Sequence, residues 1–190
     1  MYLKCTSEKA AAQQAAFEDV LMTRMCTVPF EDISIAELCR LTGMSRKTFY
    51  RLYETKADMI FAMLDHALLH AAGYVPDPSV KRGGMHHFFA YWRSQKKLLD
   101  ALRYNRVSAL LQQQAVLHVL NEQPEIVECF GADDSAYTKE MVMFYHSGLF
   151  ALVLDWHQRG YDRSIDEMSA LAMALFTTPP VKAPLKNNPY

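Results

Sequence analysis

Three helix starts within about 22 residues constrain the fold of this chain more than any other feature. Ser34 is followed three residues later by Glu37, a spacing at which the hydroxyl and the carboxylate each satisfy a free backbone donor at a helix start. Thr55 and Asp58 repeat this arrangement further along the chain. Between them, Ser45 is placed to cap another short helix. The segment is therefore predicted to contain the starts of three helices in close succession.

A glycine turn joins the first two of these helices. Gly43 ends the earlier helix, because glycine adopts the positive φ of a helix C-terminus without steric cost. The later helix opens with exposed hydroxyl and basic side chains, namely Ser45, Arg46, Lys47 and Thr48. A helix that presents such side chains at its N-terminal end is typical of proteins that insert this helix into a groove of DNA.

Helical periodicity continues through the rest of the sequence, and sustained alternation of apolar and polar residues is almost absent. A first helix is expected from about Ser7 to Met25, with Pro29 ending it. Beyond the helix that starts at Thr55, further helices are expected at roughly 81–102, 106–121, 135–159 and 164–176. The chain is therefore expected to be all-α.

The distribution of charge singles out the segment around the glycine turn. The whole chain has a formal net charge of −1, which gives no general attraction for nucleic acid. Between Arg40 and Lys56, however, five basic residues accompany a single acidic one, Glu54. A positive field concentrated on one element is expected where phosphates are to be bound.

Residues 7–70 resemble the N-terminal domain of the TetR family of transcription regulators. The family pattern is a short helix, a glycine turn, Ser-x-x-Thr followed by an apolar residue and tyrosine, an aromatic residue three positions later, and then lysine. This chain matches it in order with Gly43, Ser45, Thr48-Phe49-Tyr50, Tyr53 and Lys56. Any one element is a weak signal, whereas the combination is specific. Leu52 is a departure, because many members carry a polar residue or histidine there.

The resemblance implies roles for the matching residues. Arg46 and Lys47 would read base edges, since arginine pairs with both major-groove acceptors of guanine. Thr48 would contact a thymine methyl group or a phosphate. Phosphate contacts are also implied for Ser34, Ser45, Tyr50 and Lys56. Phe49 and Tyr53 would be core residues that hold the reading helix in place.

The resemblance also implies the organisation of the chain. A helix-turn-helix DNA-binding domain would span residues 1–72, a helical effector-binding and dimerisation domain 73–176, and a flexible tail 177–190. A proline-containing linker at 74–79 would separate the two domains. The last two helices resemble the pair through which TetR-type proteins form homodimers, and a two-fold operator requires such a dimer.

The resemblance further implies an effector pocket for a small molecule in the second domain. Aromatic and methionine side chains are dense between Met85 and Trp92, although such a stripe is also typical of an ordinary core. The candidate pocket residues are Tyr91, Trp92, Tyr104 and Phe144.

No metal site or cofactor is expected. The adjacent His86 and His87 point in different directions on a helix and have no ligand partner four residues later. His118, His146 and Cys129 supply no such spacing either, and the four cysteines of the chain show no paired spacing.

The predicted function is an effector-responsive repressor that binds a palindromic operator in double-stranded DNA as a homodimer. A cytoplasmic protein without a membrane partner is expected, because a secretion signal is lacking and the longest apolar run, near Leu149 to Leu154, is too short to span a bilayer. One alternative is an all-helical enzyme, although motifs such as HExxH, GxSxG and the P-loop are absent. Another is an interaction protein that keeps the regulator fold without specific DNA binding.

Overall fold

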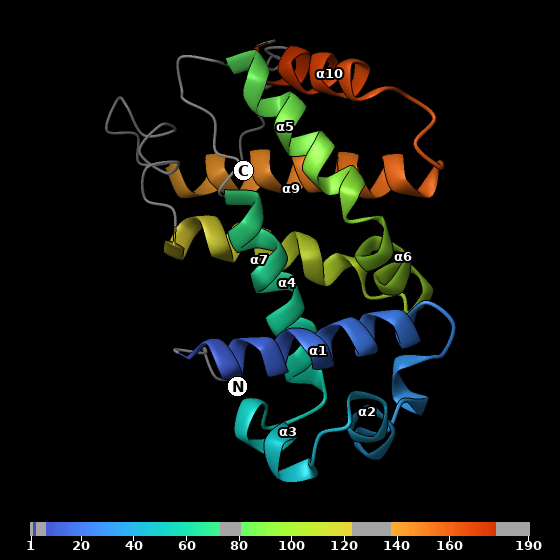
Figure 1. The fold of residues 1–190 in the computed structure, drawn as a ribbon. Helices are drawn as coiled ribbons and strands as arrows, with labels where there is room; N and C mark the ends of the chain where they lie inside the picture. The colour runs from blue at the N-terminus through green and yellow to red at the C-terminus, as the bar shows by residue number, and fades with distance from the viewer. Residues whose placement is uncertain (1, 3–6, 73–80, 123–137, 178–190) are drawn as a thin grey trace, which may run out of the picture.

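The computed structural model describes residue 2 and residues 7–72, 81–122 and 138–177, whose regular structure is helical (Figure 1). The all-α prediction is therefore confirmed for this part of the chain. The first helices are α1 (Glu8–Met25), the short 3-10 helix η1 (Phe30–Asp32), α2 (Ile35–Thr42), α3 (Arg46–Leu52) and α4 (Ala57–Ala72). The helices that follow are α5 (Lys81–Ser94), α6 (Lys96–Tyr104), α7 (Ser108–Glu122), α9 (Thr138–Gln158) and α10 (Ile165–Thr177).

The hydroxyl caps predicted for the short helices are confirmed. At the start of α2, Ser34 Oγ accepts a hydrogen bond from the backbone N–H of Glu37 at 3.1 Å. At the start of α3, Ser45 Oγ accepts one from the backbone N–H of Thr48 at 3.1 Å. Gly43 ends α2 with a φ of 68°, as the sequence predicts. These local signals fix where each short helix begins and ends.

The capping box predicted at the start of α2 is only half formed. The carboxylate of Glu37 makes an ion pair with Arg24 of α1, at 2.9 Å, in place of the predicted bond to the backbone of Ser34. At the start of α4 the box is reciprocal: Thr55 N–H donates to Asp58 Oδ2 at 2.8 Å, and Asp58 N–H donates to Thr55 Oγ1 at 3.3 Å. Glu37 thus ties α2 to α1 rather than completing the cap.

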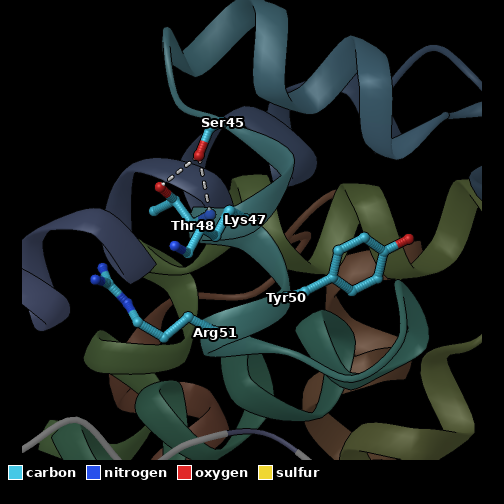
Figure 2. Close-up of a pocket in the computed structure, with 5 residues that line it drawn as sticks. All are labelled: Ser45, Lys47, Thr48, Tyr50 and Arg51. Carbon is cyan, nitrogen blue, oxygen red and sulfur yellow. Dashed lines mark hydrogen bonds between the residues drawn. The ribbon is translucent and has the colours of Figure 1, made fainter.

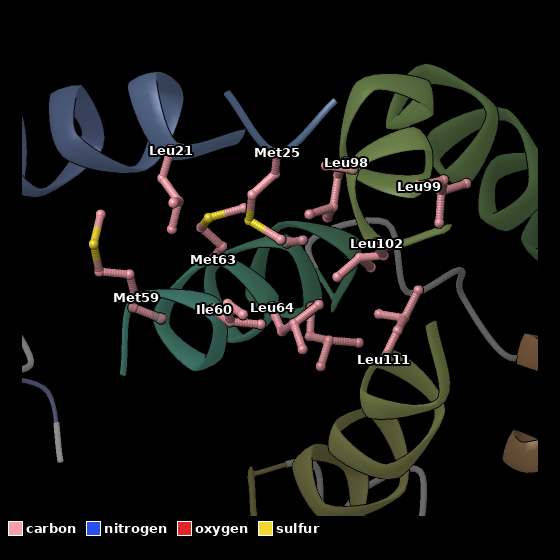
Figure 3. Close-up of a cluster of buried hydrophobic side chains, with 14 of the residues drawn as sticks. Leu21, Met25, Met59, Ile60, Met63, Leu64, Leu98, Leu99, Leu102 and Leu111 are labelled. Carbon is pink, nitrogen blue, oxygen red and sulfur yellow. The ribbon is translucent and has the colours of Figure 1, made fainter. Parts of the chain in front are cut away.

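Apolar side chains from α1, α4, α6 and α7 converge in one part of the core (Figure 3). The buried residues labelled there are Leu21, Met25, Met59, Ile60, Met63, Leu64, Leu98, Leu99, Leu102 and Leu111. Each such side chain contributes roughly 1.5–3 kcal/mol when fully buried. Buried residues continue from this cluster to Trp92 and Trp156, so α1 to α4 share one core with the later helices.

The later helices stack beyond α1 and α4 (Figure 1). The long helix α9 packs along α7, and α10 packs against α5. On the other side, α1 contacts both α2 and α6. The helix α1 therefore links the short helices α2 and α3 to the body of the molecule.

The single helix predicted over residues 81–102 is wrong, because the chain divides there into α5 and α6. The hydroxyl of Ser94 donates to the carbonyl of Tyr91 at 2.6 Å, and the N–H of Gln95 is shared between the carbonyls of Tyr91 and Trp92. These bonds end α5 at Ser94, and α6 starts at Lys96.

Several predicted features lie outside the described residues. They are the linker at 74–79, almost all of the tail at 177–190, and Cys129. Among the helices that are described, none combines the length and apolar character needed to cross a lipid bilayer.

Candidate nucleic-acid interface

The helices α2 and α3 are joined by a tight turn. The N–H of Gly43 donates to the carbonyl of Arg40 at 3.4 Å, and the N–H of Met44 donates to the carbonyl of Cys39 at 3.0 Å. These bonds close the end of α2 while Ser45 caps the start of α3. The turn therefore fixes the first residues of α3 relative to α2.

One side of α3 is buried against α1. Phe49, Leu52 and Tyr53 are each almost fully buried. The rings of Phe49 and Phe17 meet edge to face, with centroids 5.6 Å apart. The roles implied for Phe49 and Tyr53 as core residues agree with these positions. Because Leu52 also faces inward, its departure from the family pattern alters the core rather than the exposed face.

The opposite side of α3 is exposed and basic. Arg46, Lys47, Tyr50 and Arg51 are all exposed, and Tyr50 and Arg51 extend in opposite directions from the helix (Figure 2). A shallow hollow of about 420 Å³ lies against this side, lined by Ser45, Lys47, Thr48, Tyr50 and Arg51. Exposed arginine, lysine and tyrosine side chains on a short helix can donate hydrogen bonds to phosphates and to base acceptors.

Arg51 was not among the residues predicted from the sequence, although it follows Lys47 by four positions and so shares its helix face. Its guanidinium donates to Gln13 Oε1 of α1. This contact across 38 residues could not be read from the local pattern. It holds the guanidinium at the edge of the exposed face.

The hydroxyl of Thr48 is already engaged. It lies 3.0 Å from the Oγ of Ser45, and the same Oγ caps the helix (Figure 2). Thr48 was expected to contact either a thymine methyl group or a phosphate. A contact between its own methyl group and thymine would leave the hydrogen bond between the Thr48 and Ser45 hydroxyls intact. Ser34 is exposed at the start of α2, where its hydroxyl caps the helix.

Lys56 has contacts that the sequence did not predict. Its ammonium donates to the backbone carbonyls of Phe30, Glu31 and Ile33 and lies 4.3 Å from the centre of the Phe30 ring. An ammonium group has three donors, and here all three are directed at these carbonyls. The phosphate contact implied for Lys56 stays a prediction, and it requires the side chain to leave them.

The four candidate effector residues do not come together. The hydroxyl of Tyr91 is buried and donates to the carbonyl of Ala67 at 2.6 Å, while Trp92 is fully buried among aromatic rings. Tyr104 is half exposed, and Phe144 is 75% exposed. The structure thus divides the set between the core and two separate parts of the surface.

A second hollow, of about 180 Å³, lies between α4 and α7 and contains none of those four residues. The hydroxyl of Tyr2 donates to Asp65 at its edge, at 2.6 Å. Burial, together with this bond to a carboxylate, raises the pKa of Tyr2 above its ordinary value. The hollow is lined by Tyr2, Asp65, Leu69, Gln114, Leu117, His118, Asn121 and Glu122.

Among the described residues, no group of three or more histidine, cysteine or acidic side chains could hold a metal ion.

No family model and no curated protein matches this chain. The chemistry of the site therefore follows from its own side chains. These are guanidinium, ammonium, phenol and hydroxyl groups on a short helix whose other side is fixed in the core, and such groups suit a polyanion with hydrogen-bond acceptors.

Proposed function

We propose that this protein is a sequence-specific DNA-binding transcription regulator of the TetR type. In this proposal α2 and α3 form a helix-turn-helix reading head, and the later helices form an effector-binding and dimerisation domain. The observation that carries the proposal is the two-sided character of α3. Phe49 and Leu52 are buried behind it, while Arg46, Lys47 and Tyr50 are exposed in front. A helix supported in this way can enter a groove without disturbing the core.

Each exposed side chain of α3 suits a part of the duplex. The guanidinium of Arg46 can pair with O6 and N7 of guanine in the major groove. Lys47 and Arg51 supply positive charge for phosphates, which dominate affinity at low salt. The phenol of Tyr50 can donate a hydrogen bond to a phosphate oxygen.

Homodimerisation through α9 and α10 is supported by apolar surface on these helices. Met143 and Phe144 of α9 and Leu175 of α10 are large apolar side chains left exposed. Gly148 in the middle of α9 costs about 1 kcal/mol relative to alanine, and a Cβ atom added there would meet nothing within 4 Å among the described residues. Packing within the described helices gives no reason for this glycine, whereas a second copy packed closely on α9 would.

We further propose that the dimer acts in the cytoplasm as a repressor on a palindromic operator. Two reading helices related by two-fold symmetry would enter successive major grooves, about 34–36 Å apart or somewhat more. A small-molecule effector would release the operator by favouring a dimer with a different separation of these helices. The effector must then bind the two states of the dimer with unequal affinity.

The experiment that tests this proposal is selection of bound duplexes from a randomised pool, at low and at moderate salt. We expect an enriched palindrome that survives moderate salt. Replacing Arg46 by alanine should lower the affinity for the enriched duplex roughly 10- to 100-fold and relax the preference at one position of each half-site.

The matched control is Arg103→Ala, which removes an exposed arginine from α6, away from the proposed face. This variant should keep the affinity and the sequence preference of the wild type. Binding at low salt alone, with no enriched sequence, would mean non-specific attraction to phosphates and would contradict the proposal. This result would favour the alternative hypothesis, an interaction protein that keeps the regulator fold without specific DNA binding.

A further inference from the structure

Two side chains from distant parts of the chain hold the turn between α1 and α2. The backbone N–H of Phe30, at the start of η1, donates to Asn105 Oδ1 at 2.6 Å. The backbone carbonyl of the same residue accepts a hydrogen bond from the ammonium of Lys56. Asn105 follows the last residue of α6, and Lys56 precedes α4. Both polar groups of one peptide residue are thus bound by side chains far away in sequence.

The side chain of Asn105 uses both ends of its amide. Its Nδ2 donates to the carbonyl of Met25, the last residue of α1, at 2.8 Å, and to the carbonyl of Ala101 in α6 at 2.7 Å. A carboxamide has one acceptor oxygen and two N–H donors. The three partners are one N–H and two carbonyls, so asparagine matches them completely. Asn105 therefore joins α6 to the end of α1 and to the start of η1.

Lys56 reaches the same turn from the other side. Its ammonium also donates to the carbonyl of Ile33 at 2.8 Å, next to the start of α2. It lies over the ring of Phe30, a geometry in which a cation is attracted to the aromatic face. Because Lys56 follows the turn after α3, it couples that turn to the entry of α2.

A further bond fixes the same region to α6. The hydroxyl of Tyr104 donates to the carbonyl of Thr27 at 3.0 Å. Together with Asn105, this bond secures the segment that leaves α1 to the end of α6. The segment before α2 is therefore attached to α6 on one side and to the α3–α4 turn on the other.

We propose that Asn105 and Lys56, acting through Phe30, set the angle at which α2 and α3 stand relative to α6. They are positioning residues, and through this angle they set the distance between the two reading helices of the dimer. This inference rests on the proposed function. Its consequence is that the two residues determine which spacing of half-sites is accepted, while the side chains of α3 determine which bases are read.

The test uses a series of duplexes that contain the enriched half-sites at different separations, in steps of one base pair. The wild type is expected to prefer one separation. In Asn105→Ala the preference over the neighbouring separations should fall about fivefold, because the side chain that joins α6 to the start of η1 is lost in each protomer. The base preference within each half-site should be unchanged, because α3 is not altered.

The matched control is Gln112→Ala. Gln112 Nε2 donates to the carbonyl of Ser147 at 2.8 Å and so joins α7 to α9 without touching the turn before α2. This variant loses a similar bond between a side chain and the backbone, and it should keep the spacing preference of the wild type. A purely structural effect would change the two variants alike.

Lys56→Met is the second variant, and it decides the question if Asn105→Ala does not fold. It keeps an apolar stem over Phe30 but loses the three hydrogen bonds. We expect relaxed spacing in this variant, whatever happens to the dependence of its affinity on salt. An unchanged spacing preference together with a salt slope reduced by about one would show a phosphate contact and would overturn the inference.

These outcomes also separate the inference from the function on which it rests. If the wild type enriches no palindrome, the proposed function fails. If the wild type enriches one and the folded variants keep its spacing preference, the proposed function stands and the positioning role is wrong.

Discussion

Behind the exposed face of α3, a single carboxylate joins three helices. Glu18 of α1 accepts a hydrogen bond from the hydroxyl of Tyr53, the C-cap of α3, at 3.2 Å. Its other oxygen lies 2.9 Å from Nδ1 of His66 in α4. The pKa of His66 is raised above its ordinary value, chiefly by this hydrogen bond to Glu18. The contacts behind α3 therefore include a histidine whose protonated form is favoured by this carboxylate.

This contact predicts a pH-dependent contribution to stability. Because the pKa of His66 is higher in the folded state, protonation favours folding. The contribution is complete below the unfolded pKa of about 6.5 and is lost as the pH rises through the raised folded pKa. Replacing His66 by glutamine should therefore cost on the order of 1 kcal/mol or less at about pH 5.5, since the imidazole is partly exposed to screening solvent.

Denaturant unfolding of both proteins at about pH 5.5 and about pH 8.5 checks this prediction. The control is His70→Gln, which removes an exposed histidine from the same helix. The difference between wild type and His66→Gln should shrink at the higher pH, whereas the control should show no such trend. An equal difference at both pH values would contradict the assigned role of His66.

At the scale of elements, the turn between α2 and α3 depends on the conformation of one residue. Gly43 has positive φ, and a Cβ atom added there would meet nothing within 4 Å in the part of the chain that the structure describes. The cost of a side chain at this position is therefore backbone strain alone. Gly43→Ala should lower the free energy of unfolding by about 1–2 kcal/mol.

Gly43→Asn is the matched variant, because asparagine tolerates the left-handed conformation better than alanine. It should be the less destabilised of the two when both are compared by thermal unfolding. If the two variants had equal stability, the conformation of Gly43 would not limit the turn.

The elements also show which features can be read from the sequence. The caps at Ser34 and Ser45 and the turn at Gly43 involve bonds over three to five residues, so local patterns predicted them. The division between α5 and α6 has no glycine or proline to mark it, and the 81–102 prediction missed it. The contacts of Lys56 join residues more than 20 positions apart, which no local pattern reports.

For the candidate site as well, local sequence patterns predicted the local features and missed those that depend on distant parts of the chain. The exposed residues of α3 followed from helical spacing and charge, apart from Arg51. The four effector candidates were selected by residue type alone. Whether Tyr104 and Phe144 face a cavity or solvent depends on how whole helices pack, and this information lies outside any short window of sequence.

At the scale of the whole molecule, the proposed dimer predicts a specific effect of surface charge. Phe144 is the most exposed of the large apolar side chains described, and it lies on α9. Phe144→Glu should raise the dimer dissociation constant by about 100-fold, because each of two symmetric copies would place a carboxylate in an apolar contact. Sedimentation measured over a range of protein concentrations would detect the change.

Leu69→Glu is the control for this variant. Leu69 is a half-exposed apolar residue on α4, which is not one of the two helices proposed to form the dimer. It should leave the dimer dissociation constant unchanged. A wild-type protein that sediments as a monomer at high concentration would refute dimerisation through α9 and α10.

The distribution of tryptophan has a practical consequence. The chain has two tryptophans, Trp92 in α5 and Trp156 in α9, and both are fully buried. The helices α1 to α4 contain none. Indole fluorescence therefore reports on the packing around α5 and α9, whereas circular dichroism follows every helix. Recorded on one sample, the two signals distinguish loosening of α2 and α3 from unpacking around α5 and α9.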